Sequence, residues 1–293
     1  MKILRQAKAY YDEDPPTRHQ KALPPSVFEK ILELAASDRE RARATLIAGA
    51  LFFACRSCEY TNVPDKERKT RPIRACDIEF RTGARVTPHS DPAIFDAESV
   101  VIRFGKQKSG TYDDEIIMDR NTHPTLNTVH LWAETITRLV SYPGYDPQWP
   151  VYTFQNQDTK RFSKISNTEI QKDIKAAVRA IGRDSLGFGP DEVGTHSVRA
   201  SLAMQLYLQE VPPHTIMLIG RWRSDAFLTY IEQQCREFTK GLSETMLSLH
   251  SFYQLPTQRQ QRSDAAHHRT EPCNAPRVHF GRLKALHSRS RRS

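Results

Sequence analysis

The segment from Thr195 to Tyr230 constrains the fold of this chain more than any other. His196 and Arg199 lie three residues apart, so they share one face of a helix that begins after Thr195. Backbone N–H groups at the start of such a helix favour an anion. A proline pair ends this helix, and a short helix follows before Arg221. The segment therefore predicts a helical structure in which His196, Arg199 and Tyr230 contact one phosphate group.

Arg56 follows a predicted apolar helix. The residues of its buried face recur at spacings of three and four: Leu46, Ile47, Ala50, Leu51 and Ala54. This helix delivers Arg56 at its C-terminal end, and Glu59 follows three residues later. Cys55 and Cys58 flank Arg56, but a structural zinc site needs a second pair of ligands, so we expect no metal there.

Two lysines lie in the turn of a predicted β-hairpin. The runs Val100-Val-Ile-Arg-Phe and Glu115-Ile-Ile-Met are rich in β-branched residues, and a polar turn that contains glycine separates them. Lys106 and Lys108 both lie in this turn.

In this order, the segments resemble the tyrosine recombinase (phage integrase) family. The family pattern is His-x-x-Arg, a Leu-Gly-(His or Trp) turn, and a nucleophilic Tyr nine residues after that His or Trp. Tyr230 is nine residues after Arg221, and Ala54-Cys-Arg-Ser-Cys-Glu-Tyr matches the box of the family's first arginine. Each box alone is weak, but four boxes in order make a strong combined signal. The wording Gly-Arg-Trp-Arg-Ser-Asp-Ala looks most like recombinases of eukaryotic Crypton-type mobile elements.

The resemblance implies DNA strand breakage by Tyr230. Its phenolate would attack a phosphodiester and form a 3′-phosphotyrosine, with no cofactor. Arg56 and Arg199 would bind the non-bridging oxygens. His196 would donate to the phosphate or act as general base towards Tyr230.

The resemblance also implies supporting roles. Lys108 would protonate the leaving 5′-oxygen, and Lys106 is the alternative. Glu59 would support His196 or an arginine.

Arg221 and Trp222 depart from the family pattern, because Arg221 stands where the family has His or Trp. A guanidinium can donate two hydrogen bonds in a planar fork, so Arg221 would do the work of that His. In a second interpretation, a shift by one residue lets Trp222 take the packing role. In a third, Arg221 contacts a neighbouring backbone phosphate and Trp222 lies in the core.

Basic residues outside these boxes predict contacts with double-stranded DNA. Three of them share one face of a predicted helix, and a fourth follows Trp222: Lys172, Lys175, Arg179 and Arg223. The net charge of +9 and the pI near 9.4 favour a polyanionic partner. From Pro256 onward nine Lys/Arg oppose two acidic residues, so this segment carries +7 of that charge. It would anchor non-specifically to DNA, serve as a nuclear-import signal, or have no dedicated role.

The pattern predicts a mainly α fold with a small antiparallel β-sheet (α+β), like the catalytic domain of that family. Three strands are expected: Ala75–Phe80, Ser99–Phe104 and Glu115–Met118. Three helix starts are expected at the capping box Ser26–Glu29, at Thr122, and at the capping box Ser166–Glu169. A loop is expected from Gly182 to Gly194.

The expected domains are a catalytic domain over 23–253, preceded in 1–22 by the last segment of a core-binding domain and its linker, and followed in 254–293 by a basic, disordered tail. The absence of a complete core-binding domain indicates either a fragment or a loss. A helix is expected over 232–253; the resemblance implies that it packs on a neighbouring subunit in a DNA-bound homotetramer, and the alternative is that it packs on its own core. The sequence has neither a signal-peptide core nor an apolar run long enough to span a bilayer, and its five cysteines form no disulfide framework. We therefore expect an intracellular protein without a membrane partner, nuclear if the host is eukaryotic.

Three functions follow from these patterns. The first is a site-specific recombinase or integrase of a mobile element. The second is a domesticated or degenerate DNA-binding protein without turnover. The third is a relaxing enzyme that resembles type IB topoisomerases. A metal-dependent nuclease would need clustered carboxylates, and we interpret the acidic run Asp113-Asp-Glu115 as a solvated hairpin edge.

Overall fold

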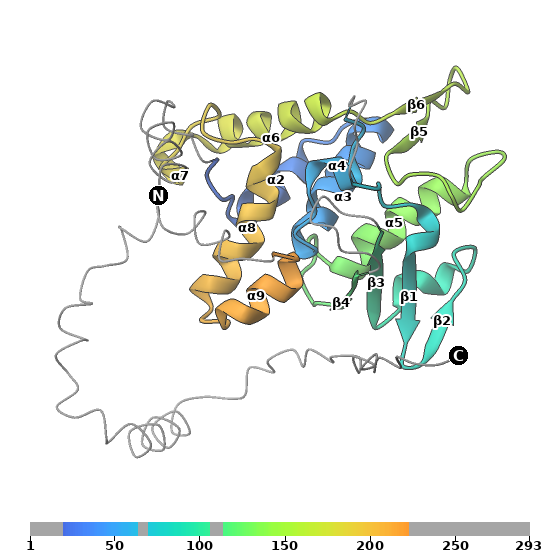
Figure 1. Cartoon of the computed structure of the whole chain (residues 1–293). Coiled ribbons are helices and arrows are strands. Elements are labelled where there is room, and N and C mark those ends of the chain that lie inside the picture. Colours follow the sequence, from blue (N-terminus) through green and yellow to red (C-terminus); the bar gives the residue numbers. More distant parts are fainter. Residues whose placement is uncertain (1–19, 64–69, 106–113, 223–293) are drawn as a thin grey trace, which may run out of the picture. The chain divides into compact units, whose positions relative to one another are not determined.

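The computed structural model describes residues 20–63, 70–105 and 114–222, which all belong to one compact unit within residues 1–239 (Figure 1). Its helices are α2 (Pro25–Glu33), α3 (Asp38–Phe52), α4 (Ser57–Tyr60), α5 (Thr128–Val140), α6 (Asn167–Ile181), α7 (Arg183–Leu186), α8 (Thr195–Leu208) and α9 (Pro213–Gly220), with the 3-10 helices η1 (Ala75–Asp77) and η2 (Pro92–Asp96). Its strands are β1 (Ile78–Thr82), β2 (Arg85–Thr87), β3 (Ser99–Phe104), β4 (Asp114–Asp119), β5 (Thr153–Gln155) and β6 (Phe162–Lys164). The predicted fold class, mainly α with a small antiparallel sheet, is confirmed.

The larger sheet has the strand order β2-β1-β3-β4, and each neighbouring pair is antiparallel. Strands β3 and β4 form the predicted hairpin, in register from Ser99 opposite Asp119 to Phe104 opposite Asp114. The predicted third strand is one residue longer at each end than expected, because Asp114 and Asp119 still pair with β3. Lys106 and Lys108 belong to the segment between these strands and lie outside the described residues.

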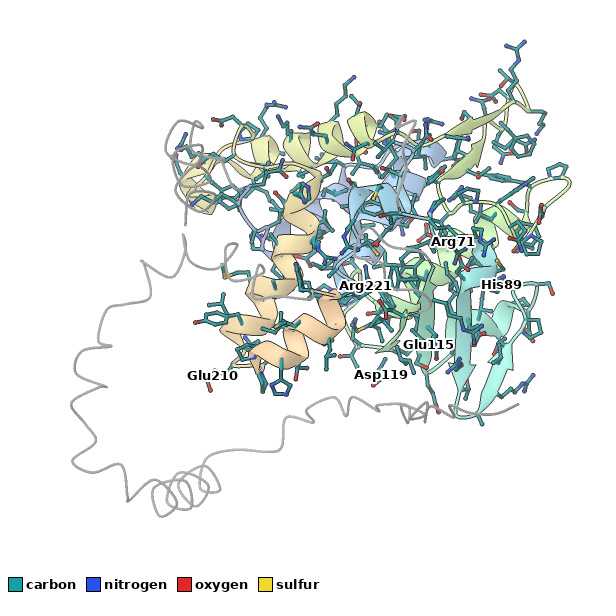
Figure 2. The ribbon with its side chains drawn as sticks, in the orientation of Figure 1. Arg71, His89, Glu115, Asp119, Glu210 and Arg221 are labelled. Atoms are coloured by element: carbon teal, nitrogen blue, oxygen red, sulfur yellow. The ribbon has the colours of Figure 1, made fainter. Side chains whose placement is uncertain are left out.

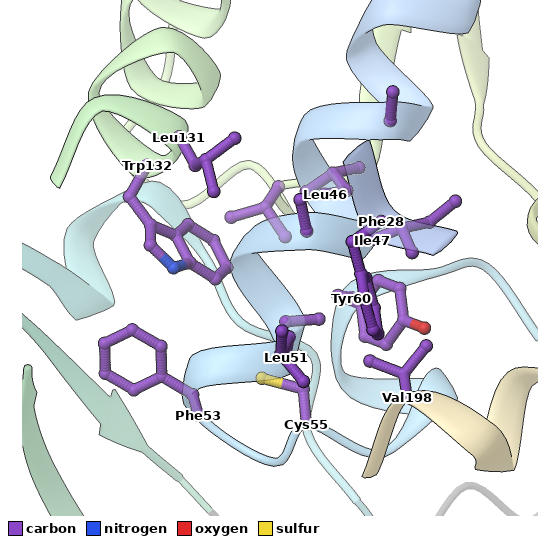
Figure 3. Close-up of a cluster of buried hydrophobic side chains, with 14 of the residues drawn as sticks. Phe28, Leu46, Ile47, Leu51, Phe53, Cys55, Tyr60, Leu131, Trp132 and Val198 are labelled. Atoms are coloured by element: carbon purple, nitrogen blue, oxygen red, sulfur yellow. The ribbon is translucent and has the colours of Figure 1, made fainter. Parts of the chain in front are cut away.

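Helix α3 is the centre of the core, with α2, α5, α6 and α8 packed around it (Figure 1). Its apolar residues recur on every side, and those from Thr45 to Leu51 are all buried. Figure 3 shows the aromatic contacts at its C-terminal end, where the Phe53 and Trp132 rings meet edge to face with centroids 5.9 Å apart. The Trp132 indole also lies against Gly49, where an added Cβ would come within 3.1 Å of it. This packing fixes the end of α3, from which the chain enters the candidate site.

Two predicted helix caps are wrong. Helix α2 begins at Pro25 and has no side-chain cap, so Ser26 lies inside the helix. A proline at the first helical position needs no cap for an N–H that it lacks, and its fixed φ suits the helix. Helix α5 begins after Asn127, whose side chain accepts from the N–H of His130 at 3.1 Å, and Thr122 does not cap it. The capping box of Ser166 and Glu169 is confirmed at the start of α6.

Several local elements differ from the predicted ones. The first strand starts at Ile78, because Ala75–Asp77 forms a 3-10 turn that the Asp77 carboxylate closes onto the N–H of Arg74. The sequence did not predict strand β2, the β5–β6 hairpin or helix α7. Helix α7 interrupts the expected loop from 182 to 194. These elements have three to four residues, too short for a hydrophobic period to be visible.

No helix within the described ranges combines the length and the apolar content that crossing a membrane requires.

Candidate active site

Arg56 is presented by a tight turn after α3. The helix ends at Phe52, and Ala54 then adopts a φ of +44°, in the left-handed region that few non-glycine residues occupy. Arg56 is therefore the residue before α4, and the prediction that it lies at the C-terminal end of α3 is wrong by this turn. The Glu59 carboxylate accepts from the Arg56 backbone N–H at 2.7 Å and from Arg56 Nη1 at 3.1 Å. Glu59 thus holds both the backbone and the side chain of Arg56.

Arg221 lies at the C-terminal end of α9 in a left-handed conformation, with φ 56° and ψ 42°. The N–H groups of Arg221 and Trp222 bond to the carbonyls of Leu218 and Met217, the pattern of a Schellman motif. This turn directs the side chain inward, between the α8–α9 pair and the sheet (Figure 2). Nη1 donates to the Phe53 carbonyl at 2.8 Å and Nη2 to Glu59 Oε2 at 2.9 Å.

The burial of Arg221 bears on its three interpretations. Its side chain is only 2% exposed and its guanidinium lies 3.4 Å from the centre of the Phe104 ring. The Arg221 side chain is enclosed by protein. This geometry gives no support to the two interpretations in which Arg221 contacts a phosphate.

Arg199 projects from α8 towards the same turn, and only 3% of it is exposed. Its two terminal nitrogens donate to the carbonyls of Ala54 and Gly220, and its guanidinium lies 4.1 Å from the centre of a Trp222 ring. Arg199 therefore joins the turn before Arg56 to the end of α9. Trp222 packs against Arg199, which the sequence predicts to lie in the active site.

His196 lies in the first turn of α8, where part of its surface is exposed and the rest is covered by protein. Its backbone N–H donates to Oε1 of Gln20 at 2.9 Å, so this N–H, which we expected to favour an anion, already has a partner. Partial burial lowers the pKa of the imidazole, and the positive charges of Arg199 and Arg56 lower it further. His196 is therefore mainly neutral at pH 7 and has one nitrogen able to accept a proton.

Cys55 is at the centre of these charges. It is fully buried, and burial together with Glu59 raises the pKa of its thiol, while Arg221, Arg199 and Arg56 act in the opposite direction. A thiol kept protonated is a poor nucleophile and a poor metal ligand. Within the described ranges, no group of three His, Cys, Asp or Glu side chains is placed to hold a metal ion.

The base of the lysine hairpin lies at the edge of this cluster. Phe104, the last residue of β3, is the ring under Arg221. The next residue, Gly105, lies so close to the Arg71 guanidinium that an added Cβ would overlap it, and Asp77 holds that guanidinium through two bonds of 2.8 and 3.0 Å. The local sequence around Arg71 contains no signal for this contact.

The structure brings together six of the predicted site residues: Arg56, Glu59, His196, Arg199, Arg221 and Trp222. Glu59 contacts two arginines, as one of its two predicted roles requires. On α6, Lys172 and Arg179 are exposed and Lys175 is half-buried, so this basic face meets solvent. Tyr230, Lys106, Lys108 and Arg223 lie outside the described residues.

Comparisons with known proteins give structural likenesses only. No protein-family model and no curated protein matches the sequence. XerH site-specific recombinase bound to its difH substrate is similar, with TM-score 0.47 and 15% identity over 74% of this chain and 52% of that chain. The Tn1549 transposon integrase with transposon right end DNA has TM-score 0.44 and 12% identity over 79% and 68%, and XerA recombinase 0.44 and 15% over 77% and 66%.

This chain thus spans about half the length of the XerH chain. The likenesses are distant, so we base the function on the residues of the site.

Proposed function

We propose that this protein cleaves and rejoins double-stranded DNA through Tyr230, as a tyrosine recombinase. The observation that supports this most is that Arg199, three residues after His196 on α8, donates to the carbonyl of Ala54, two residues before Arg56. The charges of both arginines act on the His196 imidazole. Two guanidiniums and one neutral imidazole can stabilise the negative charge that develops on a phosphodiester in the transition state of cleavage.

The roles of the arginines follow from where charge develops. Attack by a phenolate places negative charge on the non-bridging oxygens, which fixed cationic donors stabilise. Arg56 is half-buried and its charge acts on the His196 imidazole, so we assign the first contact with these oxygens to Arg56. Arg199 lies deeper, and we propose that it holds the turn of Arg56 while its charge stabilises the transition state.

The proton transfers require one base and one acid. A phenol has a pKa near 10, so neutral His196 is suited to accept its proton. We propose Lys108 as the acid towards the leaving 5′-oxygen, with Lys106 as the alternative. Both lysines follow Phe104 closely in the sequence, and the ring of Phe104 lies under Arg221.

Site-specific recombination in a mobile element is the biological role that we propose, with an affinity to Crypton-type recombinases. It rests on the Gly-Arg-Trp wording around Arg221. We further propose a homotetramer assembled on DNA, phosphate contacts by Lys172, Lys175, Arg179 and Arg223, and a nuclear location in a eukaryotic host.

A DNA-binding protein with this fold and no turnover is the second candidate. It is favoured by the position of Arg199, whose terminal nitrogens both donate to backbone carbonyls within a site that leaves it 3% exposed. Such an arginine stabilises the fold whether or not DNA is cleaved.

A nicked suicide duplex separates the two candidates, because its short 5′-hydroxyl fragment diffuses away and traps the covalent intermediate. For a recombinase, the wild-type protein forms an adduct that survives denaturing electrophoresis, and Tyr230→Phe forms none while its DNA affinity stays within about twofold. Tyr207→Phe, which alters an exposed tyrosine on α8, is the matched control and should react like the wild type. Binding without any adduct on a panel of duplexes would favour the second candidate.

A further inference from the structure

One carboxylate and two guanidiniums form a triad in the site, in which Glu59 and Arg221 are buried and Arg56 is half-buried. Glu59 is 1% exposed and uses both oxygens: Oε1 accepts from Arg56 Nη1 at 3.1 Å, and Oε2 accepts from the Arg56 backbone N–H at 2.7 Å and from Arg221 Nη2 at 2.9 Å. The Arg221 side chain is buried and its Nη1 is used by the Phe53 carbonyl. Its Nε is enclosed and has no acceptor among the described residues.

The left-handed turn fixes which way Arg221 points. A non-glycine residue is strained in this conformation, and the Schellman motif usually has glycine there. An exposed arginine would gain nothing in return for this strain. Here the turn directs the guanidinium onto Phe104 and Glu59, so contacts inside the protein offset it.

The charge of Arg221 changes what Glu59 does to Arg56. If Glu59 were paired with Arg56 alone, one negative charge would offset most of the field that Arg56 offers to a substrate phosphate. Arg221 supplies a second cation to the same carboxylate, at its other oxygen, so the triad keeps a net charge of +1 next to the substrate side. Neutral His or Trp at this position would not supply it.

We propose that Arg221 is a positioning residue, which fixes Glu59 and, through Glu59, the orientation and effective charge of Arg56, and does not touch the scissile phosphate. This inference rests on the proposed function, since it assigns how that same site is tuned. It also implies that Arg221 and Glu59 form one unit, in which the effect of each substitution depends on the other.

The experiment compares Arg221→Met, Glu59→Gln and the double variant in single-turnover cleavage of the suicide duplex at saturating protein. Methionine is unbranched and apolar, and it places the same left-handed conformation on a non-glycine residue. We expect Arg221→Met to slow cleavage by about 10- to 100-fold. The buried Glu59 carboxylate then has Arg56 as its remaining guanidinium partner, so it offsets more of the Arg56 charge and shifts that side chain away from the substrate. We expect the double variant to be at least about tenfold faster than Arg221→Met, because the neutral amide of Gln at position 59 no longer offsets the charge of Arg56.

DNA binding gives the second readout. Loss of a phosphate contact reduces the slope of log affinity against log salt by about 0.9. Because the inference gives Arg221 no phosphate contact, Arg221→Met should leave that slope unchanged. Arg138→Met is the matched control: this arginine also donates to two backbone carbonyls, those of Val151 and Thr153, but outside the site. It should lower thermal stability without changing the cleavage rate below the melting temperature.

Two results would overturn the inference while the proposed function stands: a double variant no faster than Arg221→Met, or a salt slope reduced by about 0.9 in Arg221→Met. If Arg221→Met alone does not fold, the cleavage rate of the double variant is compared with that of Glu59→Gln alone. A further loss below about threefold supports action through Glu59, and a loss near 100-fold shows a phosphate contact. A wild-type protein that forms no adduct overturns the proposed function itself.

Discussion

Two arginine networks in this molecule use buried charge in opposite ways. In the first, Arg39 and Arg43 of α3 bind Glu169 and Asp173 of α6, through bonds that include Arg39 Nε to Glu169 Oε1 at 2.8 Å and Arg43 Nη2 to Asp173 Oδ1 at 3.0 Å. Each guanidinium there has a carboxylate opposite to it. In the site, Arg56 and Arg221 share one carboxylate, that of Glu59, and backbone carbonyls accept from Arg199 and Arg221.

The difference indicates which network is built for stability and which for a substrate. A carbonyl satisfies an N–H without cancelling its charge, so the second network keeps a positive field near His196. A protein tolerates such a field where an anion is to bind. The first network cancels its charges and only joins α3 to α6.

Removing Arg199 should produce the largest loss among the following predictions. Arg199→Ala should reduce single-turnover cleavage by about 10²–10³-fold, because it removes positive charge and releases the turn of Arg56 from α9. Arg199→Lys should recover little, since an ammonium cannot reach both the Ala54 and Gly220 carbonyls. Near-normal cleavage by the lysine variant would remove the distinction between the two networks.

Lys108→Ala tests the part of the site that lies outside the described residues. Cleavage should fall by about 10²-fold, as loss of a general acid does, and a 5′-bridging sulfur should restore it because a thiolate leaves without a proton. The same pair of substrates is run with Lys106→Ala. Rescue of Lys106→Ala and not of Lys108→Ala would transfer the role to Lys106.

The pH dependence of cleavage should report His196, with a loss of about tenfold or less. Its pKa lies below the ordinary 6.5 because of partial burial and of Arg199 and Arg56, so the neutral base is fully present at pH 7 to 8. As pH falls through this lowered pKa, protonation removes the base, and cleavage should decrease only below pH 6.5. His196→Gln should be slower at pH 7.5 and lack this decrease. A wild-type rate that rises towards pH 5.5 would mean that the imidazolium is the active form.

Substitution in the charge-balanced network should change stability and leave the chemistry intact. Burial alone would raise the pKa of Glu169, but hydrogen bonds from Arg39 and Ser166 outweigh it and lower the pKa to about 2. The folded state therefore gains stability that is present above the unfolded pKa, near 4.5, and is lost as pH falls from there towards 2. Glu169→Gln should cost about 2 kcal/mol at pH 7 through the cap and the Arg39 bonds, and less at pH 3.

Chemical denaturation at both pH values measures this difference. An equal cost at pH 7 and pH 3 would show that the charge of Glu169 contributes nothing, and a loss of cleavage below the melting temperature would couple the two networks.

The sequence predicts much of the fold, because the apolar run of α3, the periodic faces of α5 and α6 and the β-branched runs of β3 and β4 are local signals. It fails where two signals compete, as at Ser26 beside Pro25. The partners within the site are not local: 162 residues separate Arg221 from Glu59, and 176 separate His196 from Gln20. Motif spacing selects which residues converge, but only the tertiary structure shows that Arg221 turns inward.

The covalent adduct tests the central claim most directly. The wild-type protein is trapped on a suicide duplex, digested with a protease and a nuclease, and its peptides are sequenced by mass spectrometry. A residual 3′-nucleotide phosphate should be attached to Tyr230, and it should be absent in Tyr230→Phe. A nucleotide on any other residue, or a wild-type protein that binds the duplex and yields no modified peptide, would contradict the account.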